Sequence, residues 1–98
     1  MEEEKRAFKR TPLTKSIRYQ KKGAQVFSNT LGRDISEGGI GFISHEFLPI
    51  STELFFEYPY PNTQEIVNSF GEIMWISLQP HSERFYVGAR FSKNPILN

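Results

Sequence analysis

Two groups of residues in this 98-residue sequence carry the side chains that binding an anionic nucleotide requires. The first is the run RAFKR, in which Arg6 and Arg10 are separated by three residues. An arginine guanidinium is planar, donates two parallel hydrogen bonds to a phosphate or to guanine, and stacks on bases. Four residues of extended chain span up to about 13 Å, so the two arginines could contact different parts of one dinucleotide. Taken alone, the pattern also fits a solvated, charged tail.

The second group is the run DISEGG, which begins at Asp34 and has the form DxSxxG. A carboxylate accepts two hydrogen bonds and therefore suits the N1–H and N2–H edge of guanine. Ser36 can cap a turn or donate to a phosphate, and Gly39 permits a positive φ or the close approach of a ligand. The alternative interpretation is a hairpin turn in which Asp34 and Ser36 only satisfy the local backbone.

Other residues whose side chains could bind a ligand or a metal give weaker signals. Trp75 could stack on a base, but a single tryptophan in an apolar strand more often belongs to the core or to a pocket wall. His45 and His81 lie 36 residues apart and show no metal-binding spacing, and the chain contains no cysteine. No nucleophile–base pair is recognisable, so the sequence predicts neither a metal site nor an enzyme.

The charge of the chain is unevenly distributed. Residues 1–33 hold nine Lys and Arg against three Glu, a net charge of +6, whereas residues 34–98 have a net charge of −5. This asymmetry favours a local anion site or a basic arm, while the overall charge of +1 argues against general nucleic-acid binding. No apolar run approaches the roughly 20 residues that span a bilayer, and the first ten residues lack the apolar stretch that is typical of a signal peptide. We therefore expect a soluble, cytoplasmic protein that does not interact with membranes.

These residues must be positioned by strands, because the hydrophobic pattern has a period of two. In residues 84–91, Phe85, Val87, Ala89 and Phe91 share one face, and the polar residues share the other. Residues 70–78 are more continuously apolar, which predicts a strand covered on both faces. Turn residues separate the runs, and this favours an antiparallel barrel or sandwich. Six strands are predicted, at residues 13–19, 24–35, 40–44, 52–58, 70–78 and 84–91.

The chain is long enough for one domain. Residues 1–12, which contain RxxxR, have little apolar content and are predicted to form a mobile N-terminal arm. Residues 13–98 are predicted to form the β-barrel domain.

The order of the motifs resembles the PilZ domain family: RAFKR, then DISEGGIGF, then the apolar strand with its tryptophan, then VGARF. Both motifs are complete, and the resemblance covers residues 5–91. It implies an all-β, six-stranded antiparallel β-barrel of the split-barrel type that binds the bacterial second messenger cyclic di-GMP. By the same resemblance Arg6 and Arg10 hold guanine and phosphate, and Asp34, Ser36 and Gly39 hold a guanine edge. Cyclic di-GMP would be bound as a ligand, and no cofactor is expected.

The resemblance also concerns Lys5 and the C-terminus. In similar domains the residue at the place of Lys5 influences how many ligand molecules bind, and a cation there favours a stacked, intercalated dimer of the ligand. The family often ends in a helix, but Pro95 discourages one here, so little or no C-terminal helix is expected. We expect a monomer or weak dimer.

The expected function is that of a receptor that converts cyclic di-GMP binding into ordering of the arm and regulation of an unidentified protein partner. Two alternatives remain. One is a PilZ-like protein-interaction module that binds no ligand. The other is a binder of single-stranded nucleic acid with a basic arm and stacking aromatic residues.

Overall fold

The computed structural model describes residues 9–92 and 96–97, which form β-strands and loops without any helix. The strands of this part of the chain are β1 (Thr11–Pro12), β2 (Ser16–Lys21), β3 (Ser28–Ile35), β4 (Gly39–Ser44), β5 (Glu53–Pro59), β6 (Ile66–Leu78), β7 (Phe85–Phe91) and β8 (Ile96–Leu97). Every pairing between them is antiparallel.

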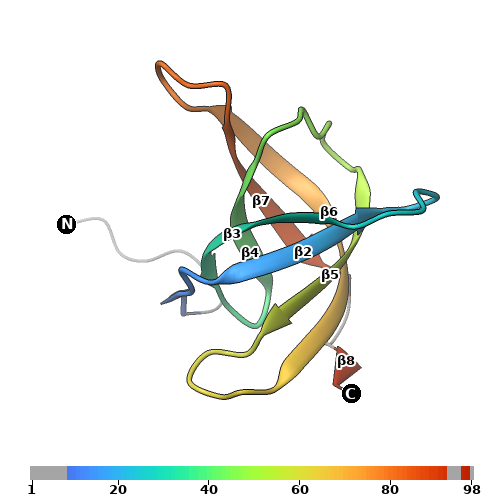
Figure 1. Cartoon of the computed structure of the whole chain (residues 1–98), viewed down its shortest axis with the longest axis vertical. Helices are drawn as coiled ribbons and strands as arrows, with labels where there is room; N and C mark the ends of the chain where they lie inside the picture. The colour runs from blue at the N-terminus through green and yellow to red at the C-terminus, as the bar shows by residue number, and fades with distance from the viewer. Residues whose placement is uncertain (1–8, 93–95, 98) are drawn as a thin grey trace.

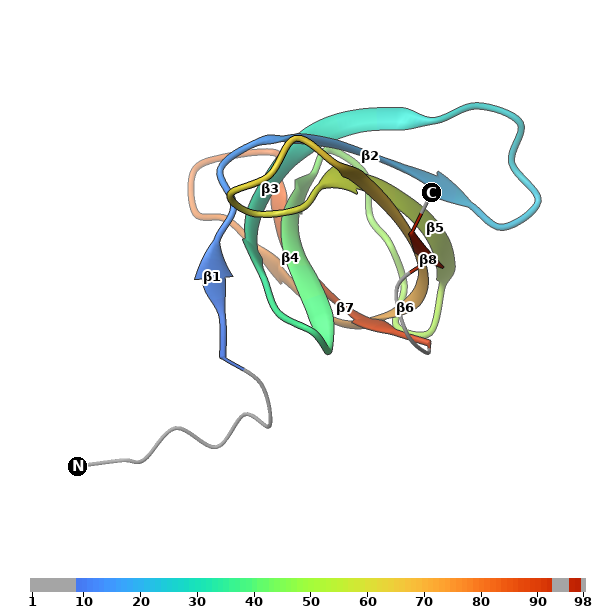
Figure 2. The same ribbon diagram turned by 90° about the horizontal axis from the view of Figure 1, so that it is seen from below.

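Six of these strands close into a barrel. They are hydrogen-bonded in the order β3-β2-β5-β6-β7-β4, and β4 pairs back onto β3. Figure 2 shows the resulting ring of strands, with the short strand β1 outside it beside β3. The other short strand, β8, adds to β6. Closure removes the unpaired strand edges that an open sheet would expose. The predicted six-stranded antiparallel β-barrel is thus confirmed.

The core fills the inside of the ring with the inward-pointing residues of each strand. Alternation along β5 and β7 places every second residue inside, as the period of two predicts. Phe56 lies at the centre, with ring centroids 5.4 Å from Phe42 and 6.3 Å from Phe91. The remaining large buried residues are Leu13, Ile17, Tyr19, Ile35, Ile40, Leu48, Leu54, Tyr58, Val67, Ile73 and Val87.

Two irregularities change which residues face outward. The pairing of β3 with β4 shifts between Gly32 and Asp34, and that of β6 with β7 shifts between Ile73 and Trp75. An extra residue in one strand locally interrupts the alternation of faces. Met74 and Trp75 are consequently exposed. Phe70 and Leu78 are exposed as well, so the prediction that residues 70–78 are covered on both faces is wrong.

The residues that directly precede β2 are held against the barrel. Thr11 and Pro12, which the sequence assigned to the mobile arm, form β1 and pair with Ile35 and Asp34. Leu13 follows in the core and donates its backbone N–H to a carbonyl of β3, Arg33 O, at 2.9 Å. These contacts hold the last residues before β2 against the barrel.

Other boundaries also differ from the sequence prediction. Residues 24–27, expected in the second strand, belong instead to the long loop between β2 and β3, which projects from the barrel in Figure 1. Strand β6 begins at Ile66, four residues before the predicted start at residue 70. At the C-terminal end β8 stands where the family often has a helix, which agrees with the predicted lack of one. Among the described residues there is no helix with the length and hydrophobicity needed to cross a membrane.

Candidate functional site

Asp34 lies at the centre of the candidate site, on the outer face of β3. Its Oδ1 atom accepts a charge-assisted hydrogen bond from Nη1 of Arg10, which directly precedes β1. Its Oδ2 atom accepts a hydrogen bond from the hydroxyl of Tyr86 on β7, at 2.9 Å. The side chains of Arg10 and Asp34 are 25% and 22% exposed, so the ion pair is partly shielded but still reachable from solvent.

The register of the sheet explains why these residues meet. Cross-strand pairing runs from Pro12 on β1 to Asp34, then to Gly41 on β4, Gly88 on β7 and Trp75 on β6. Directly paired residues of neighbouring strands point to the same face of a sheet. Asp34 and Trp75 therefore lie in one row across five strands on the outside of the barrel, with Tyr86 beside this row, two residues before Gly88 on β7.

The two glycines in this row make room for its larger side chains. A Cβ atom at Gly41 would lie 2.9 Å from Asp34 Oδ1 and 3.3 Å from the Tyr86 ring. A Cβ atom at Gly88 would overlap the indole of Trp75. The carboxylate, the phenol and the indole consequently lie close against the backbone of β4 and β7.

Tyr86 connects the carboxylate to the aromatic part of the site. Its ring meets the edge of Trp75 with centroids 4.9 Å apart and an interplanar angle of 88°. The Arg33 guanidinium lies 4.7 Å from the centroid of the same ring, a cation–π contact. Burial raises the pKa of Tyr86, as do its hydrogen bond to Asp34 and the negative charge of that residue, while Arg33 and Arg10 oppose the change. The phenol is therefore a neutral hydrogen-bond donor at physiological pH.

The turn between β3 and β4 holds the rest of the DxSxxG motif. The Ser36 N–H donates to Gly39 O at 2.9 Å, and Ser36 Oγ accepts from the Gly38 N–H at 3.1 Å. A Cβ atom at Gly39 would overlap the carbonyl of Ala89 on β7. Ser36 thus stabilises the turn, and Gly39 is needed because β4 and β7 approach closely. This geometry agrees with the hairpin-turn interpretation of these two residues.

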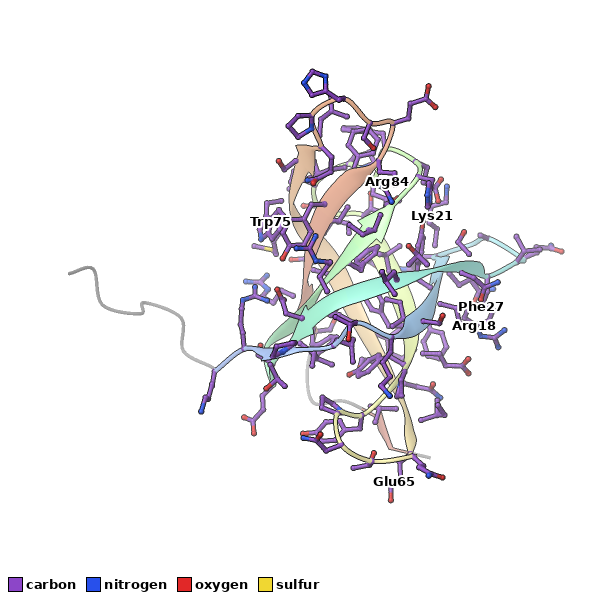
Figure 3. The ribbon with its side chains drawn as sticks, turned by 60° about the vertical axis from the view of Figure 1, so that its left-hand side comes forward. Arg18, Lys21, Phe27, Glu65, Trp75 and Arg84 are labelled. Carbon is purple, nitrogen blue, oxygen red and sulfur yellow. The ribbon has the colours of Figure 1, made fainter. Side chains whose placement is uncertain are left out.

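The structure brings together Arg10, Asp34 and Trp75 from the predicted set, with the turn of Ser36 and Gly39 directly after Asp34. Trp75 is exposed, so the expectation that it belongs to the core is wrong. Figure 3 shows it on the opposite side of the barrel from Arg18 and Phe27. Lys5 and Arg6 lie outside the described residues. Among the described residues, no group of three His, Asp or Glu side chains is placed to hold a metal ion.

Sequence reasoning missed Tyr86 and Arg33. The alternation of residues 84–91 does place Tyr86 on the outer face of its strand. Nothing in the pattern pairs it with Asp34, because the two are 52 residues apart in the chain. Arg33 sits at the bulge of β3, which a strict period of two does not reveal.

The strands and this outer-face cluster define a small β-barrel domain, and comparison with known proteins gives its family. The family model described as "PilZ domain" matches residues 4–97, so the chain belongs to the PilZ domain family. PilZ domains are non-enzymatic and are typically receptors for cyclic di-GMP.

One solved structure shares the fold over nearly the whole chain. It is the inhibitor of motility MotI/DgrA of Bacillus subtilis, with a TM-score of 0.78 and 19% sequence identity. The match covers 93% of the present chain but 44% of that chain, so the domain spans less than half the length of this relative. A comparison with curated proteins finds no sequence match.

Proposed function

We propose that this domain is a cyclic di-GMP receptor that binds its ligand around Asp34 on the outer face of β3, β4 and β7. One observation carries the proposal: Arg10 of the RxxxR motif and Asp34 of the DxSxxG motif, 24 residues apart in sequence, are in direct contact. Membership of the PilZ family supports it, since the family typically binds this messenger.

The contact leaves hydrogen-bonding capacity on both partners. Arg10 binds Asp34 through Nη1, whereas its buried Nε has no hydrogen-bond partner among the described residues. A guanidinium has five N–H donors, so a ligand phosphate or guanine O6 and N7 can occupy those that remain. Each carboxylate oxygen of Asp34 accepts one bond here and has a second lone pair. Guanine N1–H and N2–H are the pair of donors that fits them.

The other motif residues complete the proposed site. Ser36 Oγ and the backbone at Gly39 are proposed to contact the same guanine, and Trp75 to flank a base. Arg6 is proposed to hold the second guanine or a phosphate. Lys5 is proposed to favour two stacked ligand molecules, so that Lys5→Leu changes stoichiometry more than affinity.

The proposed output is ordering of the segment that precedes β1. Strand β1 pairs with β3 at Asp34 itself, so a ligand at Asp34 acts next to the point where this segment joins the barrel. Arg6 would bring the segment over the ligand, and the new surface would regulate a protein partner. Amide exchange of residues 1–8 should slow when cyclic di-GMP is added, and unchanged exchange would contradict this mechanism.

Calorimetric titration tests the proposed function. The protein should bind cyclic di-GMP much more tightly than cyclic di-AMP, GMP or short single-stranded DNA, because adenine has no equivalent of the N1–H and N2–H pair. Arg10→Ala should lower the affinity roughly tenfold to a hundredfold, the effect of losing a charge-assisted hydrogen bond of about 1.5–3 kcal/mol.

The matched control is Arg18→Ala, which removes the same side chain on the opposite side of the barrel (Figure 3). It should bind as the parent does. Equal affinity for cyclic di-GMP and cyclic di-AMP would refute recognition of the guanine edge. Binding of single-stranded DNA with a steep salt dependence would favour the nucleic-acid alternative. An Arg10→Ala variant with parental affinity would remove Arg10 from the site.

A further inference from the structure

Tyr86 shares the Asp34 carboxylate with Arg10, although it belongs to neither motif. Its hydroxyl donates to Oδ2 at 2.9 Å, while Arg10 donates to Oδ1. Each oxygen of the carboxylate therefore has one partner, and the two partners come from segments more than 70 residues apart. This arrangement fixes the rotation of the carboxylate about its last side-chain torsion, which is otherwise broad for aspartate.

The surroundings of Tyr86 hold its ring in a single position. The central guanidinium carbon of Arg33 lies 4.7 Å from the centroid of the ring. The ring of Trp75 packs edge-to-face against it, with the two centroids 4.9 Å apart. Beneath it, Gly41 provides the space in which the ring and the Asp34 carboxylate lie together. A tyrosine that is half-buried, packed on two sides and bonded through its hydroxyl is a rigid donor.

We propose that Tyr86 is a positioning residue for guanine recognition, whose hydroxyl orients the Asp34 carboxylate so that both oxygens meet the N1–H and N2–H donors of one guanine. This inference rests on the proposed function. The two guanine donors are coplanar, so a freely rotating carboxylate would satisfy both only part of the time. The tyrosine hydroxyl uses one lone pair of Oδ2 and leaves the other for the base.

The test uses Tyr86→Phe and two ligands that differ only at the group in question. Cyclic di-GMP carries both donors, whereas cyclic di-IMP keeps N1–H and lacks the N2 amino group. The parent should prefer cyclic di-GMP. Tyr86→Phe should reduce this preference several-fold, up to roughly tenfold, because it removes one hydrogen bond to a charged group. Affinity for cyclic di-IMP should change much less.

A double-mutant cycle shows whether Tyr86 acts through Asp34. In an Asp34→Ala background, Tyr86→Phe should have no further effect on either ligand. Tyr60→Phe is the matched control, since Tyr60 is exposed and follows β5, a strand that carries none of the site residues. It should leave both affinities at the parental values, and thermal melts should confirm that every variant is folded.

The outcomes separate this inference from the proposed function. Tyr86→Phe with an unchanged preference for guanine would overturn the positioning role while leaving the receptor function in place. An equal loss for both ligands that persists in the Asp34→Ala background would also overturn it, because Tyr86 would then act only by packing. A parent protein that binds neither dinucleotide would overturn both proposals.

Discussion

Replacing Asp34 by alanine should destabilise the barrel even without ligand. The carboxylate accepts hydrogen bonds from Arg10 and from the Tyr86 hydroxyl. Hydrogen bonds to charged groups contribute about 1.5–3 kcal/mol each when well shielded. Here the two side chains of the ion pair are 25% and 22% exposed, so water can replace part of what is lost. Exposed ion pairs contribute about 0–1 kcal/mol. We therefore expect Asp34→Ala to lower the free energy of unfolding by about 2 kcal/mol.

For a domain of this size, 1 kcal/mol shifts the melting temperature by roughly 4–8 °C, so the variant should melt roughly 8–16 °C below the parent. Glu57→Ala is the control. Glu57 accepts one side-chain hydrogen bond, from Arg18 at 2.6 Å, in a pair whose side chains are 46% and 28% exposed. Its loss should lower the free energy of unfolding by about 0.5 kcal/mol. Ligand-free thermal melts compare the two variants. If Asp34→Ala has the same melting temperature as the parent or as Glu57→Ala, the reasoning that both donors are held by this carboxylate is refuted.

Two further predictions concern Tyr86 and Gly88. Because the pKa of Tyr86 is raised in the folded protein, its contribution to stability should be complete below the ordinary tyrosine pKa of about 10 and lost as the pH rises through its own pKa. Asp34→Asn should lower the pKa of Tyr86, seen as earlier tyrosinate absorbance in a difference titration against the parent; an unchanged titration would contradict the contact. Gly88→Ala should displace the Trp75 indole and destabilise the domain by about 1–3 kcal/mol. The emission spectrum of the tryptophan should shift as the indole moves, and an unshifted spectrum would show that the indole does not lie on Gly88.

The sequence predicted the barrel well because alternation of faces is a local property. In β7 every second residue packs inward, and the same rule holds along β5. The rule failed where a bulge breaks the period, since Met74 and Trp75 were expected in a strand covered on both faces and are exposed. It also failed at β1, since Thr11 and Pro12 carry no apolar pattern and are held by backbone pairing and by Leu13 behind them.

The site was only partly predictable for a different reason. Each motif could be found by itself, because its residues are close in sequence. The Arg10–Asp34 contact depends on β1 joining β3, and the Tyr86–Asp34 contact depends on β4 lying between β3 and β7. The role of Gly41 follows only from the second contact, since the glycine clears space for two side chains that the sequence keeps far apart.

The closing of the barrel has a consequence for how the domain folds. Hairpins such as β5–β6 join neighbouring segments, whereas β4 pairs with β7, more than 40 residues further along the chain. Such distant pairings bear the largest loop-closure entropy and make all-β domains slow to fold. Asp34 on β3 and Tyr86 on β7 meet over β4 only when β4 has paired with β7. A chain in which every hairpin has formed but the ring is still open therefore has both motifs without the contact between Asp34 and Tyr86. The proposed binding surface is therefore expected among the last parts of the molecule to form during folding.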